Sequence, residues 1–416
     1  MFRFTIAIQI ICLMLSFLFG PFAYGYEYKD NNDVLIRQIS GIIKAKLQFA
    51  DDKPIVDCLE RLRERDTQKE FCYCAEQVIQ ALENSDDDNS TALLCWHLLI
   101  ELAEPSQINQ GFHNTCALAA LEKILCYKDP SLLCNLVLQA RSGKILLSNE
   151  RVIILPGSNL RPDRESRSFR RGGGFRSYAG QLFQIAAANA FWQSQNVDPR
   201  GIEIKPGSIM YVQDFEKESG KKGDTGERLI IKWSDNLSEY VTDGSAWGPC
   251  FDLDRLAVTF QLLTGKTTFP PLLVYKSRGA GRNVTKFGSE EDLRRNLLQF
   301  KRQGELPAIV SINPANLSCR KARFYRADGG GRIIYLYSSS NADIWHVLCI
   351  IDYDENKDIV KLDNSWGPSA RGNNSQSVHS LFAESLPFAV RNSETAASAN
   401  HGVKQSGQFR AGSRAV

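Results

Sequence analysis

The chain has 416 residues, 43% of them hydrophobic, and a formal net charge of +3 at pH 7. This length and apolar content permit a large core, in two domains or in one domain enlarged by insertions. The charge is too small to indicate nucleic acid or a membrane surface as the partner. Helix and strand signals alternate irregularly along the chain, which predicts an α+β protein.

Residues 1–25 have the composition of a secretory signal peptide. Arg3 supplies one positive charge, an uncharged apolar region follows, and Ala23-Tyr24-Gly25 offers a small-residue cleavage site. We expect cleavage near Gly25 and a secreted or periplasmic protein without stable membrane association. The alternative is an uncleaved membrane anchor, because the uncharged run is just long enough to span a bilayer.

Residues 26–105 are predicted to form a helical N-terminal module. Apolar residues recur at helical intervals in four segments, namely 35–47, 56–62, 78–82 and 93–102. Four cysteines lie close together in this part of the sequence: Cys58, Cys72, Cys74 and Cys95. Because an exported protein can form disulfides, we expect these cysteines to cross-link the module.

Cys116 is predicted to begin a helix. The polar segment from Gln110 to Thr115 leads into apolar residues at helical spacing, and Asn114 or Thr115 can cap the first turn. At a helix N-terminus the backbone N–H groups and the helix dipole can lower a thiol pKa from ~8.5 to roughly 3.5–7.5. Cys116 is therefore a candidate nucleophile, and a buried structural cysteine is the alternative interpretation.

The middle of the chain alternates between predicted helices and strands. We expect helices at 129–138, 177–192 and from about 252, and strands within 144–155 and at 209–212, 229–233, 307–312 and 332–337. Residues 161–176 contain six arginines and three consecutive glycines. Such a composition predicts a mobile surface loop.

Residues 345–367 are predicted to form a β-hairpin that carries His346. Two runs rich in β-branched and apolar residues flank the turn composition of residues 354–357. If the turn is centred on Glu355, His346 lies opposite Asn364, and a shift of half a residue brings Asp363 or Ser365 there instead. In each case the histidine gains a polar neighbour that can orient it. A nucleophile, a base and an orienting group are what thiol-based acyl transfer requires.

These blocks resemble the active site of papain-like cysteine peptidases. Gln110 precedes Cys116 by six residues, His346 begins an apolar strand, and Asn364-Ser365-Trp366-Gly367 follows at a similar interval to that in the family. The resemblance covers about thirty residues in three blocks, in the family's order. Leu263-Thr264-Gly265 is also similar to the calpain branch.

The resemblance implies a role for each of four residues. Cys116 is the nucleophile, and His346 is its base and then an acid. Asn364 orients the imidazole, and the side chain of Gln110 completes an oxyanion hole with the backbone N–H of Cys116. Papain has Gly-Ser before its nucleophile and Trp after it, whereas this chain has Asn114-Thr115 and Ala117, which places the substrate-backbone contacts in doubt.

The resemblance also implies a fold. We expect a papain-like catalytic domain at 106–390, with a helical left domain that carries the nucleophile helix and an antiparallel β-sheet right domain. The strands at 307–312 and 332–337 would join the hairpin in that sheet. Because the interval from Cys116 to His346 is much longer than in papain, insertions are expected within 150–340. Residues 391–416 contain few apolar side chains and are expected to be a disordered tail.

The predicted reaction is hydrolysis of a protein or peptide substrate through a thioester, without a cofactor. No metal is expected, because Cys72-Tyr73-Cys74 lacks zinc-ligand spacing and the histidines are scattered. His113 is a rival base close to Cys116 in sequence, but no orienting partner for it is evident. His97 is expected to be a satisfied helix residue.

Three alternatives remain open at this point. Transglutaminase-like or deamidating acyl transfer needs the same side chains. A non-catalytic binding protein on a degenerated peptidase fold is favoured by Asn114 and Ala117. The module at 26–105 is either an inhibitory pro-segment or an integral helical subdomain.

Overall fold

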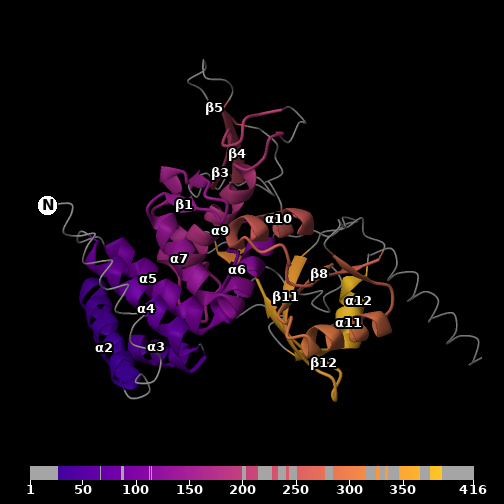
Figure 1. Ribbon diagram of the computed structural model, residues 1–416, viewed down its shortest axis with the longest axis horizontal. Coiled ribbons are helices and arrows are strands. Elements are labelled where there is room, and N and C mark those ends of the chain that lie inside the picture. The colour runs from indigo at the N-terminus through magenta and orange to yellow at the C-terminus, as the bar shows by residue number, and fades with distance from the viewer. Residues whose placement is uncertain are drawn as a thin grey trace, which may run out of the picture. The chain divides into compact units, whose positions relative to one another are not determined.

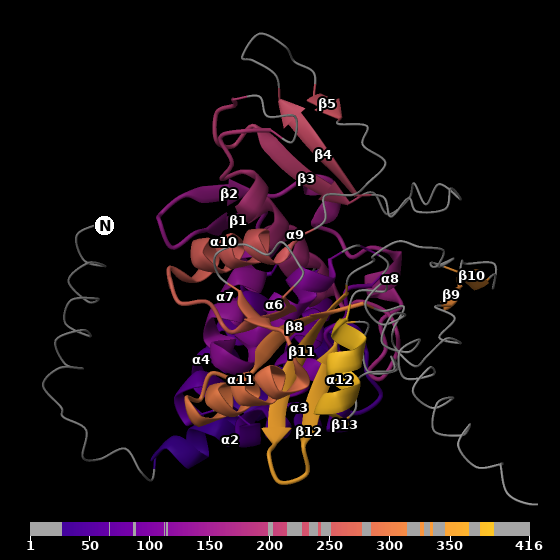
Figure 2. The same ribbon diagram turned by 90° about the vertical axis from the view of Figure 1, so that its right-hand side faces the viewer.

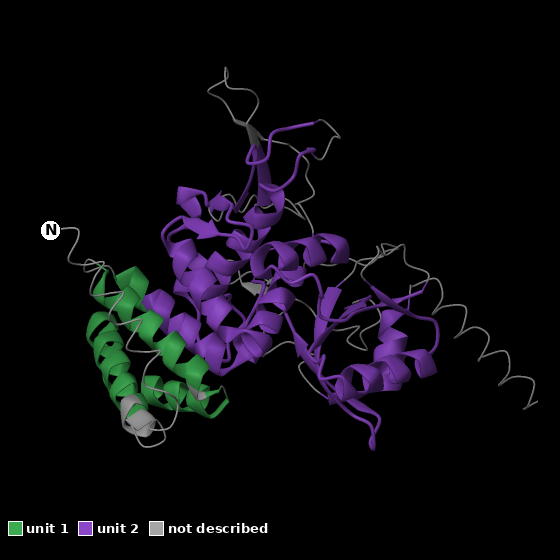
Figure 3. Cartoon of the chain, in the orientation of Figure 1, with its two compact units in different colours: residues 1–92 green, residues 93–416 purple. Residues whose placement is uncertain are grey.

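The computed structural model describes residues 27–65, 67–85, 89–111, 113, 115–198, 203–213, 227–232, 240–242, 251–276, 284–313, 325–327, 333–335, 346–365 and 375–386. The predicted signal peptide, the predicted C-terminal tail, Asn114 and Trp366 lie outside these residues. The chain divides into two compact units, residues 1–92 and 93–416 (Figure 3). Among the described helices, none combines the length and hydropathy that crossing a bilayer requires.

The first unit is helical, as the sequence predicts. It contains α2 (Glu27–Leu47), α3 (Lys53–Arg65), α4 (Gln68–Glu83) and the start of α5 (Asn89–Ala103). One apolar stripe on each of α2 to α4 is buried, for example at Ile39, Leu59 and Val78. The disulfide expectation is wrong: the four cysteines at 58, 72, 74 and 95 are reduced thiols. The buried apolar stripes already give these helices a core without cross-links.

The second unit begins with a layer of helices. Its longer members are α6 (Cys116–Lys128), α7 (Pro130–Arg141), α9 (Tyr178–Trp192) and α10 (Leu253–Thr264) (Figure 1). Local signals set their ends: Asp129, Ser177 and Asp252 each accept a hydrogen bond from a first-turn backbone N–H. All side chains of α9 are buried, which places this helix at the centre of the layer.

A six-stranded sheet follows, in the order β13-β12-β11-β8-β6-β7. These strands are β13 (Ser375–Ser377), β12 (Ile359–Asn364), β11 (His346–Asp354), β8 (Ala308–Ile312), β6 (Leu272–Tyr275) and β7 (Thr285–Phe287). β6 runs parallel to both β7 and β8, and the other pairs are antiparallel. The expectation of a wholly antiparallel sheet is therefore wrong. The helix α11 (Glu290–Arg302) joins β7 to β8 as a crossover, which lets these two strands point in the same direction.

The predicted strand at 332–337 does not join this sheet. β10 (Ile333–Tyr335) pairs with β9 (Tyr325–Ala327) in a separate two-stranded sheet. Both edges of β11 are already occupied, one by β8 and the other by β12, so no hydrogen-bonding edge remains beside the hairpin. The strand predicted at 307–312 is confirmed as β8.

Two smaller sheets confirm the other predicted strands. β1 (Lys144–Leu146) pairs with β2 (Val152–Ile154). A three-stranded sheet contains β3 (Ile209–Gln213), β4 (Glu227–Lys232) and β5 (Tyr240–Thr242).

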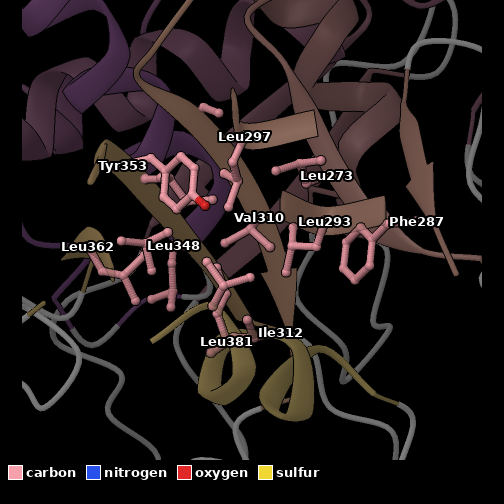
Figure 4. Close-up of a cluster of buried hydrophobic side chains, with 14 of the residues drawn as sticks. Leu273, Phe287, Leu293, Leu297, Val310, Ile312, Leu348, Tyr353, Leu362 and Leu381 are labelled. Carbon is pink, nitrogen blue, oxygen red and sulfur yellow. The ribbon is translucent and has the colours of Figure 1, made fainter. Parts of the chain in front are cut away.

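The six-stranded sheet is covered on both faces. α11 and α12 (Val378–Ser385) cover one face (Figure 2), where they enclose an apolar cluster that includes Leu293, Val310, Leu348 and Leu381 (Figure 4). On the other face α6 packs against β11, and the thiol of Cys349 lies 3.6 Å from the carbonyl oxygen of Ala120. The helix that begins with Cys116 is thereby packed on the strand that begins with His346.

Candidate active site

Cys116 is the first residue of α6, as predicted, and its side chain is half-buried. The N-cap residue is Thr115, but its hydroxyl does not cap the first turn. It donates instead to Gln184 Oε1 at 2.7 Å and to the carbonyl oxygen of Gln110 at 3.3 Å. The prediction that the Thr115 side chain can cap α6 is therefore wrong. The sulfur lies at the positive end of the helix dipole, where a thiolate is stabilised.

His346 and Asn364 are in direct contact. The imidazole Nε2 lies 2.7 Å from Asn364 Oδ1, and both residues are almost completely buried. An amide oxygen only accepts hydrogen bonds, so Nε2 carries the proton in this contact and Nδ1 is the basic nitrogen of the neutral ring. The predicted contact between His346 and Asn364 is thus present, and it fixes the orientation of the imidazole ring.

The register behind this contact differs from the predicted one. Asn364 lies opposite Leu348 rather than opposite His346, because the turn is centred later than Glu355 and the β-bulge in β11 between Ile350 and Asp352 offsets only part of this shift. His346 reaches Asn364 diagonally, from two positions further along the same face of the strand. Diagonal neighbours across an antiparallel pair lie close enough for long side chains to touch.

The bulge also explains how β11 fills the core. Leu348, Ile350 and Tyr353 belong to one apolar cluster, although Tyr353 breaks the alternation of a regular strand. The extra residue at Ile351 shifts the alternation by one position, so the side chains on either side of it face the same core.

Asp363 is not the partner of His346. It lies opposite Cys349, on the face that packs against α6, and its Oδ1 accepts from Lys123 Nζ at 2.6 Å. The Lys123 side chain is fully buried and also donates to the carbonyl oxygen of Pro105. Burial raises the pKa of Asp363, and the neighbouring ammonium of Lys123 opposes that rise. This pair ties the nucleophile helix to the strand that carries Asn364.

Gln110 is tied to the residue that follows Asn364. Its backbone N–H donates to the Ser365 carbonyl oxygen at 2.7 Å, and the Ser365 hydroxyl donates to Gln110 Oε1 at 3.2 Å. Gln110 Nε2 donates one of its two N–H groups to the carbonyl oxygen of His113 at 2.9 Å. The segment that precedes Cys116 and the end of β12 are therefore joined by hydrogen bonds at the point where the candidate site residues lie.

Burial controls the charge of His346. It lowers the pKa of His346 to about 4, although the hydrogen bond to Asn364 partly opposes this shift. The imidazole is therefore neutral at pH 7 unless an anion lies beside it. A neutral imidazole is the form that can accept a proton.

The arginine-rich segment is not a mobile surface loop, contrary to the prediction. Residues 164–167 form α8 (Arg164–Arg167), and Asp163, Glu165 and Arg176 are buried. Arg176 Nη2 lies 3.1 Å from Asp163 Oδ2, and the Arg176 backbone N–H donates to Glu165 Oε1. Composition misleads here because paired charges can be buried where isolated ones cannot.

A buried polar network lies behind the nucleophile helix. Its centre is Gln184 on α9, which contacts Thr115, Asn109, Glu122 and Arg176. The carboxyl groups of Glu101 and Glu122 are fully buried neighbours, and burial raises the pKa of both. Desolvated neighbouring carboxyl groups favour a state in which one of them keeps its proton.

One group of side chains in the described part of the chain could hold a metal ion. Single ligand atoms of His113, Asp163 and Glu165 lie within 4.8 Å of one another, and all three residues are buried. The histidines are scattered in the sequence, but this fold brings one of them beside two carboxylates. Asp163 already pairs with the Arg176 guanidinium, which competes with a cation for that charge. His113 Nδ1 also lies 3.7 Å from Glu227 Oε1.

Sequence reasoning missed Gln184, Lys123 and Glu122, which are polar residues on apolar helices. The available signal was their position: each lies on an otherwise buried face, where a polar side chain needs a partner. His97 is a satisfied helix residue as expected, because its Nδ1 accepts from the backbone N–H of Tyr178 at 2.9 Å. No family model, curated protein or solved structure matches this chain.

Proposed function

We propose that the protein is a thiol-dependent hydrolase of peptide bonds, with Cys116 as nucleophile, His346 as base, Asn364 as orienting group and Gln110 as an oxyanion donor. The observation that carries the proposal is the buried 2.7 Å contact between His346 Nε2 and Asn364 Oδ1. This contact holds the imidazole in one tautomer and leaves Nδ1 as its basic nitrogen, as the role of a general base requires.

The packing around this contact supports the same assignment. α6, which begins with Cys116, packs on β11, which begins with His346. The segment between Gln110 and Cys116 is joined to Ser365, the neighbour of Asn364. A helix N-terminus placed against a strand with the base is the papain-like arrangement that the sequence motifs imply, and we propose that fold for residues 106–390.

The reaction follows from these roles. His346 Nδ1 takes the thiol proton of Cys116 as the sulfur attacks the substrate carbonyl carbon, and the C–N bond then breaks as His346 returns the proton to the leaving amine. Water attacks the resulting thioester, gives its proton to His346, and releases the carboxylic acid and the thiol. No oxidant or cofactor enters this balance.

The oxyanion needs donors that are already in place. Gln110 Nε2 has a second N–H beyond the one that it donates to His113, and the Cys116 backbone N–H belongs to the first turn of α6. Ser365 fixes the amide orientation of Gln110, because its hydroxyl donates to Oε1 and so directs Nε2 to the other side.

The low pKa of His346 favours a neutral thiol and imidazole at rest, with proton transfer during attack. A resting thiolate–imidazolium pair forms only if the thiolate stabilises the imidazolium. Transglutaminase-like transfer would use the same side chains and differs in its acceptor, which is an amine in place of water.

A thiol-directed probe tests the proposal. We expect wild type to react with a peptidyl electrophile and to hydrolyse a peptide library, and Cys116→Ser to do neither. Cys126→Ser is the matched control, because Cys126 lies on the same helix and its thiol contacts the carbonyl oxygen of Glu101. It should keep both activities.

Other outcomes of this experiment point elsewhere. Product linked to an added amine in place of water would favour transglutaminase-like transfer. Absence of labelling at every pH, with the fold intact, would contradict an enzyme and favour a binding protein. Secretion after removal of residues 1–25 is a separate part of the proposal, and the N-terminal sequence of the exported protein tests it.

A further inference from the structure

Gln184 lies on α9, outside the four residues of the proposed site, and its side-chain amide is fully used. Oε1 accepts from the Thr115 hydroxyl at 2.7 Å and from Arg176 Nη1 at 3.3 Å. Nε2 donates to the carbonyl oxygen of Asn109 at 3.0 Å and to Glu122 Oε2 at 3.1 Å. Two donated and two accepted bonds satisfy the whole capacity of a carboxamide.

Two of these contacts hold the ends of a single segment. Asn109 immediately precedes Gln110, and Thr115 immediately precedes Cys116. The segment between them, residues 109–115, therefore has both ends bonded to one side chain of a buried helix. The positions of the two proposed oxyanion donors depend on this segment.

The other two contacts fix which way the amide points. Glu122, on α6, accepts from Nε2, and Arg176 donates to Oε1. If the amide were rotated by 180°, Nε2 would face the donor of Arg176 and Oε1 would face the acceptor of Glu122. Glu122 lies beside Glu101 of α5, and Arg176 pairs with Asp163. Glu122 and Arg176 therefore orient the Gln184 amide, and this amide binds both ends of residues 109–115.

From this arrangement we infer that Gln184 is a positioning residue of the proposed active site, and that it fixes the oxyanion donors by binding both ends of residues 109–115. The inference rests on the proposed function and adds to it a residue that no active-site motif of the sequence contains. Gln184 itself does not contact the reacting atoms.

Gln184→Met tests the inference, because methionine keeps the length of the side chain and removes all four hydrogen bonds. A misplacement of the donors by about 1 Å can cost about 100-fold in rate. We expect kcat for a peptide substrate to fall by about 10- to 100-fold, with a smaller change in KM. Alkylation of Cys116 by iodoacetamide forms no oxyanion, so its rate should stay within about threefold of wild type.

Gln181→Met is the matched control. Gln181 lies one turn earlier on α9, is equally buried, and also makes bonds with both ends of its amide. Its partners are Asn159, Arg161, Asp163 and Ser166, which belong to another segment. The two variants should lose similar stability, but only Gln184→Met should slow turnover relative to alkylation.

Hydrogen exchange supplies a readout that does not need activity. Backbone amides of residues 109–116 should exchange faster in Gln184→Met than in Gln181→Met. If Gln184→Met does not fold, Thr115→Val removes the hydroxyl contact with little change in shape and should give the same split between kcat and alkylation.

The outcomes separate the two proposals. If wild type is active and both methionine variants lose turnover and alkylation in equal proportion, Gln184 is only structural and the inference is wrong. Unchanged exchange at residues 109–116 also overturns it. If wild type neither reacts with the peptidyl electrophile nor hydrolyses peptide, the proposed function fails, and the inference fails with it.

Discussion

The two regions that carry the proposed site are built in different ways. The region of Cys116, around α6 and α9, has an interior that contains Glu101, Glu122, Arg176 and Gln184. The region of His346, formed by the six-stranded sheet with α11 and α12, encloses an apolar cluster (Figure 4). The first interior combines the apolar side chains of α6 and α9 with a hydrogen-bonded polar network, whereas the cluster of the second is apolar.

Because of this difference, amino-acid substitutions should affect the stability of the two regions in different ways. A packed apolar core accepts changes of shape at a cost that scales with the volume lost. A buried polar network fails when one member loses its partner, because the remaining group is left desolvated. The stability of the region of Cys116 should therefore be sensitive to single polar substitutions. The stability of the region of His346 should be sensitive to large-to-small apolar substitutions.

The largest expected effect is on His346, in the region of the six-stranded sheet. His346→Ala removes the proposed base, so peptide hydrolysis should fall by about 10² to 10⁴-fold. His379→Ala is the control, since His379 is an exposed histidine that contacts Glu290 on the surface. Equal activity of His346→Ala and wild type in a peptide cleavage assay would remove His346 from the mechanism.

Lys123 of α6 links the two regions through its ion pair with Asp363 of β12. Its substitution therefore tests how much this link contributes to stability. Lys123→Met leaves Asp363 buried without its ion-pair partner and should lower the free energy of unfolding by about 3–5 kcal/mol. The double variant Lys123→Met with Asp363→Leu should recover much of this loss in urea titrations. A single variant as stable as wild type would mean that the pair contributes nothing.

Leu348→Ala tests the apolar region alone. Leu348 is fully buried in the sheet cluster, so a cavity should cost about 2–5 kcal/mol of unfolding free energy. Leu146→Ala is the control, because Leu146 is 53% exposed and should change stability by less than about 0.5 kcal/mol. Similar losses for the two leucines in chemical denaturation would contradict the described packing.

The pH dependence tests the polar region. Burial, with a smaller effect of Arg170, lowers the pKa of His97 to about 3, below its ordinary value of 6.5. The folded state therefore binds fewer protons than the unfolded state in this window, and stability is lost as the pH falls from 6.5 towards 3. His97→Gln should make this slope shallower by about 1.4 kcal/mol per pH unit. Parallel slopes for wild type and His97→Gln in urea titrations would show that His97 does not titrate there.

The smallest expected difference concerns two helix caps. Ser177 caps α9 in the polar region and also donates to the fully buried Glu101, whereas Ser289 caps α11 at the sheet and also contacts the partly exposed carboxylate of Asp292. Ser289→Ala should cost about 1 kcal/mol, and Ser177→Ala should cost about 2 kcal/mol because Glu101 also loses a donor. Thermal denaturation of both variants checks this difference, which would disappear if the Glu101 contact contributed nothing.

The predictable parts of the fold are those whose signals are local. Periodicity and caps identify the helix that begins at Cys116 and the hairpin that carries His346, and motif spacing identifies Asn364 as the partner of the imidazole. The mixed sheet was not predicted, because β6 and β8 are parallel through a crossover that no turn signal marks.

The remaining features depend on contacts between distant positions. Lys123 and Asp363 are separated by 240 residues, and Gln184 meets Thr115 across 69. A β-bulge moves the hairpin register, and apolar patterning alone does not locate the extra residue at Ile351. Residues 161–176 resemble a solvated loop because their buried partners cannot be read from composition.

The hairpin that carries His346 ends in the exposed turn at Glu355, Asn356 and Lys357. Along the nine residues of β11, successive positions are about 3.3 Å apart, so this turn lies about 26 Å from the imidazole. The strands are anchored between the two ends by β8 and β12. A fluorophore or an affinity tag can therefore be inserted at the turn, and turnover can be followed on an immobilised or labelled molecule without disturbing its chemistry.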